Sequence, residues 1–307
     1  MTLTSCSEND FTCLDGRCVN LDERCDGKAD CQDRSDEEDC EAFITYSGYN
    51  KFFHPPPVGN NANFSMNVSI IIDKFIDINE NDGFFKTKIT FVRKWLNSQL
   101  TYLNLKRNPT RNAISTEDMD KIWKPWSVFE NIEDNNQWQK TSVQDIMMII
   151  PDQEFNFEMD DKTNFRNTRL FNGETNIIDY QRQFTVNWFC DFDMRWYPFD
   201  SQRCTMEIFQ SEASITLIPA SVAYLGPLEL TQHIVKNVTI CQATIRGRSG
   251  IIVEVTLGRP LFGTILTVFM PTIILLVLSQ VVRVFGQDHL EMVIEVNLTL
   301  LLVLATL

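Results

Sequence analysis

Six of the nine cysteines of this chain lie within its first 40 residues, at positions 6, 13, 18, 25, 31 and 40. A segment this short cannot bury enough apolar surface to fold by itself, so disulfides and a bound metal have to stabilise it. Carboxylates between the last cysteines are hard oxygen ligands of the kind that Ca²⁺ selects; they are Asp26, Asp30, Asp36 and Glu37. The sequence therefore predicts a small, disulfide-rich, calcium-binding module in an oxidising compartment.

This module also carries more than half of the net charge. The chain has 307 residues and a formal net charge of -14, and residues 1–40 hold twelve Asp and Glu against four Lys and Arg. Such an acidic chain is a poor partner for the phosphates of nucleic acids. We therefore expect no nucleic acid among its partners.

The other end of the chain is apolar. Residues 261–282 form a run of 22 residues without a charged side chain. As a helix this run is roughly 33 Å long, which matches a bilayer core of about 30 Å. A second apolar run begins at Val296 and reaches Leu307, and its twelve residues make only about 18 Å of helix. We therefore expect two α-helical transmembrane segments, the second incomplete because the sequence is part of a longer membrane protein.

Short strands are predicted between these two ends. In "YQRQFTVNWFC" the apolar Phe184, Val186 and Trp188 alternate with polar residues, which is the period of a half-buried strand. Asn172-Gly173 is a hairpin signal before it, and the turn residues of "FFHPPPVGNN" separate this part from the module. Strands and turns over about 200 residues predict an immunoglobulin-like β-sandwich.

Three Asn-x-Ser/Thr sequons predict glycosylation where they face water; they begin at Asn63, Asn67 and Asn237. A fourth match, at Asn297, falls in the second apolar run and is expected to be a chance match.

No catalytic set is recognisable. The histidines His54, His233 and His289 are scattered without metal-ligand spacing, and no phosphate-binding loop or nucleophile elbow occurs. We therefore do not expect an enzyme.

Residues 6–40 resemble the LDL receptor class A repeat, because the six-cysteine spacing occurs together with Cys-Asp-Gly and Ser-Asp-Glu. The resemblance implies that backbone carbonyls of Glu23 and Lys28 complete the calcium shell. Glu23 takes the place of the aromatic residue with which other members dock a lysine of a partner, so a calcium-stapled spacer and a ligand-binding module are both kept as interpretations. The resemblance also implies the bridges Cys6–Cys18, Cys13–Cys31 and Cys25–Cys40.

The segment "CDFDMRWYPFDSQRC" places two cysteines around thirteen residues. A disulfide between Cys190 and Cys204 would lower the conformational entropy of the unfolded chain and so stabilise the fold by about 3 kcal/mol, on the chain-entropy model. The apolar residues of the loop are too many for a solvated tip and need a surface to pack against; they are Phe192, Met194, Trp196 and Phe199.

A β-rich ectodomain, this loop and then membrane helices resemble, in that order, the Cys-loop receptors, the pentameric ligand-gated ion channels. The resemblance covers residues 42–307 and includes "WLNSQLTY" and "IWKPWSVFEN". It implies a subunit that joins four others, identical or different, in the lipid bilayer of the plasma membrane, with residues 1 to about 259 extracellular. The loop positions that match the family signature are Phe192, Met194, Tyr197, Pro198, Asp200 and Cys204.

The same resemblance implies that the loop sits at the foot of the ectodomain and transmits ligand binding to the gate. Arg259 resembles the basic residue that ends the last strand, and Glu80 resembles its acidic partner. The predicted coupling residues are Glu80, Pro198, Phe199, Asp200 and Arg259.

The ligand site departs from the family pattern. When the sequence is set beside the family pattern, Trp95 matches one aromatic residue of the ligand site. Glu130 and Glu212 stand where the family has aromatic rings. The loop before the last strand, which caps the ligand site in this family, is reduced to "IRGRSG". Two carboxylates near a tryptophan suit a cation, a polyamine or a metal, so we expect a small extracellular ligand, cationic if these acids bind it, and not a typical aromatic-box neurotransmitter. The alternative is that both glutamates are solvated loop acids.

The second apolar run carries a polar stripe. On a helix with 100° per residue, the five residues of this stripe fall within an arc of about 80°. Five copies around an axis would stack rings of carboxylate, hydroxyl and leucine, which predicts a cation-selective pore. The alternative is that the glutamates only cap the start of a helix. The stripe consists of Glu291, Glu295, Thr299, Leu302 and Thr306.

These predictions define a multidomain chain: the module at 1–41, a linker with a short N-terminal helix at 42–58, the sandwich at 59–259 and the membrane helices at 260–307. The predicted function is that of a ligand-gated, cation-selective channel subunit with Ca²⁺ as a structural cofactor. Two alternatives stay open: a membrane-anchored binding or adhesion receptor that uses the module, and a silent accessory subunit.

Overall fold

The computed structural model describes residues 6–7, 10–38, 40–59, 63–132, 145–159, 168–285, 294–295 and 297–299. Two compact units are distinguished by their internal contacts. The first unit combines residues 1–189, 205–226 and 239–254, and the second combines residues 190–204, 227–238 and 255–307.

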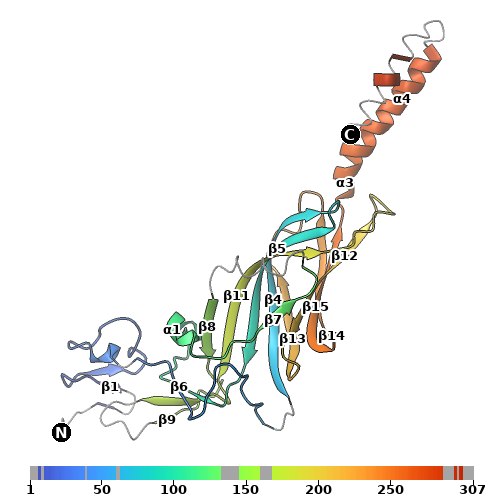
Figure 1. Cartoon of the computed structure of the whole chain (residues 1–307). Coiled ribbons are helices and arrows are strands. Elements are labelled where there is room, and N and C mark those ends of the chain that lie inside the picture. The colour runs from blue at the N-terminus through green and yellow to red at the C-terminus, as the bar shows by residue number, and fades with distance from the viewer. Residues whose placement is uncertain are drawn as a thin grey trace. The chain divides into compact units, whose positions relative to one another are not determined.

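Residues 6–40 fold as a disulfide-bonded module, drawn in blue in Figure 1. β1 (Asp10–Thr12) pairs antiparallel with β2 (Cys18–Asn20), and a 3-10 turn follows at Ser35–Glu37. Its small buried core contains Phe11 and Leu21 packed with two of the cysteines, so the disulfides carry much of its stability. The bridges match those implied by the resemblance: Cys6–Cys18, Cys13–Cys31 and Cys25–Cys40.

The central sheet of the first unit has five strands in the order β13-β4-β5-β11-β8 (Figure 1). Their bounds are β4 Phe64–Asn79, β5 Phe84–Trp95, β8 Asp145–Ile150, β11 Ile177–Phe189 and β13 Ile215–Tyr224. The alternation predicted for β11 is confirmed. Phe184, Val186 and Trp188 are at most 4% exposed, while the polar residues between them are half-buried.

A second sheet has the order β14-β15-β12-β7, with β7 Ser127–Phe129, β12 Ser201–Gln210, β14 Ile234–Ile245 and β15 Arg248–Gly258. The ring of Phe129 on β7 packs edge-on against Phe184 and Trp188 of β11, with centroids 5.1 and 5.5 Å apart. Because these strands belong to different sheets, the contact forms the aromatic core of the predicted β-sandwich.

A smaller sheet has the order β3-β6-β10-β9, with β3 Phe43–Thr45, β6 Leu100–Leu103, β9 Glu158–Met159 and β10 Arg169–Asn172. The prediction of a hairpin at Asn172-Gly173 was therefore wrong, since the strands on either side belong to different sheets. Gly173 is needed for a close approach instead, because a Cβ there would lie 2.1 Å from the carbonyl oxygen of Asn97.

Residues 42–58 contain β3 and turns, and the short helix predicted there was wrong. β3 pairs with β6, and three successive prolines, at 55–57, remove amide donors that a helix needs. Short helical turns follow β6 instead, as a 3-10 turn at Pro109–Asn112 and α1 at Thr116–Met119.

The second unit contains the disulfide loop, the end of β15 and the C-terminal helices. Helical turns follow one another as α3 (Leu261–Thr264), a π-helical turn (Ile265–Phe269) and α4 (Met270–Phe285). Within the described part of the chain, none of the helices combines the length and the apolar character needed to cross a membrane.

A buried hydrogen bond in the central sheet provides a test of this core. The indole Nε1 of Trp188 donates to Oγ1 of Thr87 at 2.8 Å, and both residues are fully buried. Thr87→Val keeps the shape but leaves the indole unpaired, so the free energy of unfolding should fall by about 1–3 kcal/mol in denaturation of the purified chain. The same substitution at half-buried Thr101 should cost less than about 0.5 kcal/mol; equal losses in the two variants would contradict the assignment.

Candidate functional site

The disulfide loop exposes its apolar tip. The Cys190–Cys204 bond closes it, with Cα atoms 5.2 Å apart. Trp196 and Phe199 are 75% and 70% exposed, whereas Pro198 is buried. Large aromatic rings exposed on a short loop favour packing on another apolar surface.

An ion pair holds this loop at its base. Asp200 Oδ1 lies 2.7 Å from Nε of Arg259, and the two side chains are only 2% and 6% exposed. The guanidinium also lies over the ring of Tyr197, 4.7 Å from its centroid, where the ring face attracts a cation. Burial by itself would raise the pKa of Asp200, but hydrogen bonds from Arg259 and Gln202 outweigh it and hold the pKa below its ordinary value. Arg259 therefore keeps Asp200 charged in a buried position.

The pair lies at the junction between the last strand and the first helix. β15 ends at Gly258 and α3 begins at Leu261. The hydroxyl of Ser201 donates to the carbonyl of Leu257 at 3.3 Å, next to the same junction. The loop is therefore bonded to the point at which the chain leaves β15 for the helices. The pairing of Arg259 with Glu80, a half-buried residue of the first unit, stays a prediction.

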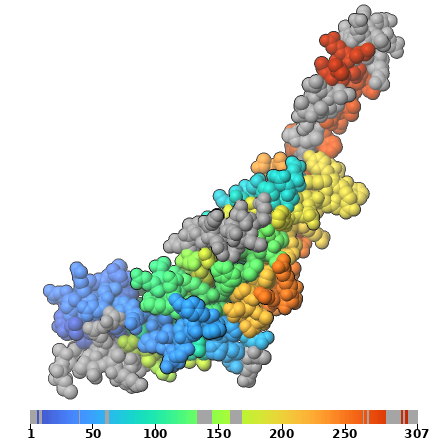
Figure 2. Space-filling model, in the orientation of Figure 1, coloured from blue at the N-terminus to red at the C-terminus, as the bar shows by residue number. Residues whose placement is uncertain are grey.

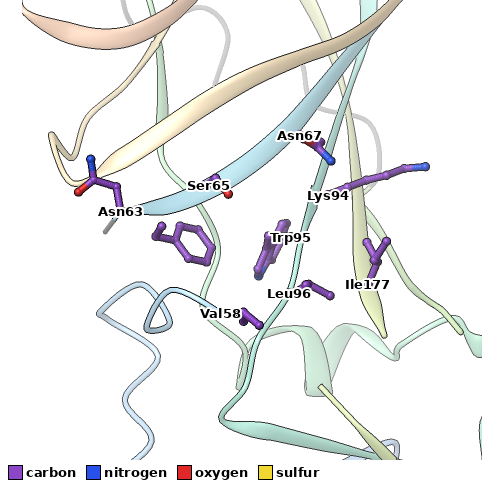
Figure 3. Close-up of a pocket in the computed structure, with 9 residues that line it drawn as sticks. Val58, Asn63, Ser65, Asn67, Lys94, Trp95, Leu96 and Ile177 are labelled. Carbon is purple, nitrogen blue, oxygen red and sulfur yellow. The ribbon is translucent and has the colours of Figure 1, made fainter. Parts of the chain in front are cut away.

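Trp95 is a core residue. It is 2% exposed, and its ring contacts Trp123 and Tyr180 edge-on at 5.7 and 6.3 Å. It borders a pocket of about 220 Å³ formed by the start of β4 and the end of β5, with Val58 and Ile177 (Figure 3). Because the ring is enclosed, Trp95 lacks the open aromatic face that the sequence interpretation required, and the ligand site proposed below does not include it.

Glu130 follows β7 directly and is paired with the capping loop. Its carboxylate lies 2.5 Å from the guanidinium of Arg246, with 20% of the glutamate side chain and 72% of the arginine side chain exposed. Arg246 and Gly247 form the two-residue turn between β14 and β15, and both have positive φ, 49° and 75°, as a type I′ hairpin requires. The turn thus places the guanidinium of Arg246 against Glu130, an acid that the sequence predicts to bind the ligand.

Glu212 lies away from Glu130. β7 pairs with β12 over three residue pairs; Glu130 lies at one end of this ladder, and Glu212 lies beyond the other end. At about 3.3 Å per residue, more than about 10 Å of strand separates them. That the two acids form one cation site stays a prediction. Arg248, in the same hairpin, donates to the carbonyl of Ser211, so the arginines of "IRGRSG" are the signal that sequence reasoning missed.

The predicted calcium acids are partly turned towards backbone amides. Asp36 is fully buried, and its Oδ2 accepts the amide of Asp30 at 2.6 Å. Its Oδ1 has no hydrogen-bond partner, which fits an oxygen that can bind a cation. Glu37 accepts the amide of Asp26 at 2.9 Å. In the described segments, no group of three or more His, Cys, Asp or Glu side chains is gathered closely enough to hold a metal.

The three sequon asparagines, Asn63, Asn67 and Asn237, are all exposed. Asn63 and Asn67 line the pocket next to Trp95 (Figure 3). Their positions meet the condition that glycosylation requires, and the glycans stay a prediction.

The predicted pore stripe is described only at Glu295 and Thr299, where the hydroxyl of Thr299 donates to the carbonyl of Glu295 at 3.1 Å. Glu291, Leu302 and Thr306 lie outside the described residues. The pore stays a prediction.

The fold and the loop define a chain in which a β-sandwich with a disulfide-closed loop follows a disulfide-rich module. The sequence model of the neurotransmitter-gated ion-channel ligand binding domain matches residues 44–217, and that of the low-density lipoprotein receptor domain class A matches residues 4–40. The first match covers more than half of the chain, so the chain belongs to the neurotransmitter-gated ion-channel family. Both resemblances seen in the sequence are confirmed. The family consists of channel receptors and not of enzymes.

Some similar proteins match most of the chain, and others match the module alone. The gamma-aminobutyric acid receptor subunit beta-4 of Gallus gallus is 22% identical over 272 residues, 85% of this chain and 50% of that protein. The serotonin-gated chloride channel mod-1 of Caenorhabditis elegans is 23% identical over 226 residues, 70% of this chain and 41% of that protein. The module is 60% identical to 35 residues of the atrial natriuretic peptide-converting enzyme of Rattus norvegicus, 11% of this chain and 3% of that protein. The chain thus spans half or less of the length of these relatives.

The buried pair at the loop base predicts a large effect of a single charge. Asp200→Asn leaves Arg259 buried without its counter-charge, so the free energy of unfolding should fall by about 3–5 kcal/mol. Thermal unfolding of the purified chain measures this, and replacing Arg259 by Met in the same chain should recover much of the loss. The control is Asp193→Asn, which breaks the exposed pair with Arg195 in the same loop and should leave stability nearly unchanged. Equal effects of the two Asn variants would show that the buried pair does not hold the loop.

Proposed function

We propose that this chain is one subunit of a pentameric ligand-gated ion channel in the plasma membrane, with residues 1 to about 259 outside the cell. The observation that carries the proposal is the buried pair of Asp200 with Arg259. It bonds the disulfide loop to the residue between the last strand and the first helix, so a displacement of that strand pulls on the loop and the helix together. A receptor that passes ligand binding to a membrane gate needs a rigid connection at this point.

The other end of the same strand suggests where the ligand acts. β15 runs from Arg248, next to the hairpin turn, to Gly258, next to Arg259. Glu130 and Arg246 form an ion pair at the turn, and because the arginine side chain is 72% exposed, the pair contributes only about 0–1 kcal/mol. A ligand that replaces the pair would therefore move the turn at small cost.

Opposite charges at one position favour a zwitterion. Its ammonium group would take the place of Arg246 at Glu130, and its carboxylate would bind the released guanidinium, each as a charge-assisted hydrogen bond. The relatives are named for gamma-aminobutyric acid and for serotonin, and the first of these is a zwitterion at neutral pH. We propose a small zwitterionic amine as the ligand class.

The module would hold Ca²⁺ as a structural ion. Asp36 supplies a buried oxygen without a hydrogen-bond partner. The carboxylates of Asp26, Asp30 and Glu37 and the carbonyls of Glu23 and Lys28 would complete the shell, as in the repeat that the module resembles. A bound divalent ion would neutralise much of the negative charge of the segment.

The apolar run at 261–282 would form the first membrane span, and the second run would line the pore. We propose that the pore conducts cations, because a glutamate one turn inside a span is costly unless it faces water. One relative is named a chloride channel, and the reversal potential distinguishes a cation-selective pore from a chloride-selective one.

The ligand proposal predicts a loss of response when Glu130 loses its charge. Glu130→Gln should raise the half-maximal concentration of γ-aminobutyrate, used as the zwitterionic probe, by about tenfold to a hundredfold, the usual worth of a hydrogen bond to a charged group. Currents from the complete receptor in cells measure this effect.

Glu212→Gln is the matched control, because Glu212 lies outside the proposed site, and its half-maximal concentration should stay within about threefold of the original. A receptor that responds to the cation serotonin and not to the zwitterion, with equal loss in both variants, would refute the zwitterion site.

The pore proposal predicts that Glu295 sets the ion selectivity. In the complete receptor the reversal potential should follow the cation gradient, and Glu295→Gln should reduce cation permeability because a ring of carboxylates is lost. Glu254, a glutamate of β15 in the ectodomain, provides the control Glu254→Gln, which should leave the reversal potential unchanged. A reversal potential that follows chloride in the unmodified receptor would refute the cation-selective pore.

A further inference from the structure

A buried lysine joins the module to the sandwich within the first unit. Lys106 follows β6 and is 5% exposed. Its Nζ donates to the carbonyl oxygens of Leu21 and Arg24 at 2.8 and 2.6 Å. Burial removes water from the ammonium group and lowers the pKa of Lys106 to about 8. The two hydrogen bonds to backbone carbonyls partly replace the lost water. Both carbonyls lie in the module between Cys18 and Cys25, whose bridges fix the segment.

Complementary charges surround this lysine. The module contributes aspartates and the sandwich contributes arginines to these contacts. One arginine of the module also donates a hydrogen bond to the sandwich. Figure 2 shows the blue module lying against the green part of the sandwich beside it. The contacts, at 3.1–3.4 Å, are Arg111 with Asp26, Arg169 with Asp22, and Arg24 with the hydroxyl of Thr168.

The loop that carries Lys106 is also bonded to the edge of the central sheet. The side chain of Asn112 accepts the amide of Lys106 at 2.7 Å and donates to the carbonyl of Ile149 at 3.1 Å. The amide of Ile114 donates to the carbonyl of Met147 at 2.8 Å. Both acceptors belong to β8, which ends the strand order of that sheet. Residues 104–114 therefore contact the module on one side and β8 on the other.

The docking contacts and the predicted calcium site share one segment. One carboxylate oxygen of Asp26 pairs with Arg111, and the other accepts the amide of Lys28 at 3.0 Å. The carbonyls that bind Lys106 lie on either side of Glu23 in the chain. Residues 21–28 therefore contain both the docking groups and three of the predicted calcium ligands.

We propose that the module is a calcium-dependent clamp on the ectodomain of its own chain, and that the loop at 104–114 is its partner. Ca²⁺ orders residues 21–28, which then hold Lys106 and Arg111, and the held loop in turn protects β8. The chain's own basic side chains occupy this face of the module, so an external basic ligand would first have to displace them. The inference does not depend on whether the chain forms a channel.

Hydrogen–deuterium exchange of the purified full chain tests the clamp. Lys106→Met keeps most of the side-chain volume and removes the charged donor. It should speed exchange of the amides at 18–26 and 146–150 about tenfold. Leu21 and Arg24 lose their donor directly, and β8 is affected because the loop at 104–114 that is bonded to it loses its hold on the module. An excess of chelator should have the same effect on the unmodified chain and should add little to the variant.

Lys121→Met is the matched control, because Lys121 is exposed and pairs with Asp118 in α1; exchange at β8 should not change. If Lys106→Met prevents folding, Arg111→Gln at a half-exposed position should still speed exchange of β8 about threefold. Exchange of β8 that is insensitive to Arg111→Gln and to Lys106→Met would overturn the clamp. Exchange that responds to the variants and not to the chelator would overturn its dependence on calcium.

Discussion

A buried carboxylate–guanidinium pair is the constraint on which the second unit depends. Asp200 and Arg259 are almost completely removed from water, and such a pair adds little net stability because the loss of hydration offsets the attraction between the charges. Its effect is on geometry. Gln202 bonds both to Asp200 and to the backbone of the loop, so the loop folds around the carboxylate. Its aromatic tip then points outward while its base stays fixed to the end of β15.

Much of the fold could be predicted because it follows from covalent or periodic patterns. The spacing of six cysteines led to a repeat whose bridges the structure reproduces, and the alternation in β11 located its buried face. The turn at Asn172-Gly173 shows the limit of such reasoning. Its residue types suit a hairpin, but the glycine is needed because the backbone at Asn97 approaches it closely, a contact that no local pattern reveals.

The candidate ligand site was predictable only in part, because register assigns a position in a strand without assigning its burial. Trp95 occupies the expected position but is enclosed by other aromatic rings. The pair of Glu130 with Arg246 and the contacts of Lys106 with the module join segments far apart in the chain. Long side chains that meet across such distances leave no periodic signal in the sequence, so only the structure could bring them together.

Glycans on the two sequons at the start of β4 would restrict how copies of this domain can pack. Asn63 and Asn67 are four residues apart, and side chains separated by an even number of positions in extended chain project from the same face. A sugar on either would lie beside the pocket that both residues line (Figure 3). Because a branched, hydrated sugar keeps another polypeptide at a distance, a glycosylated subunit would have to turn this face towards solvent and meet its neighbours through other edges of the sandwich.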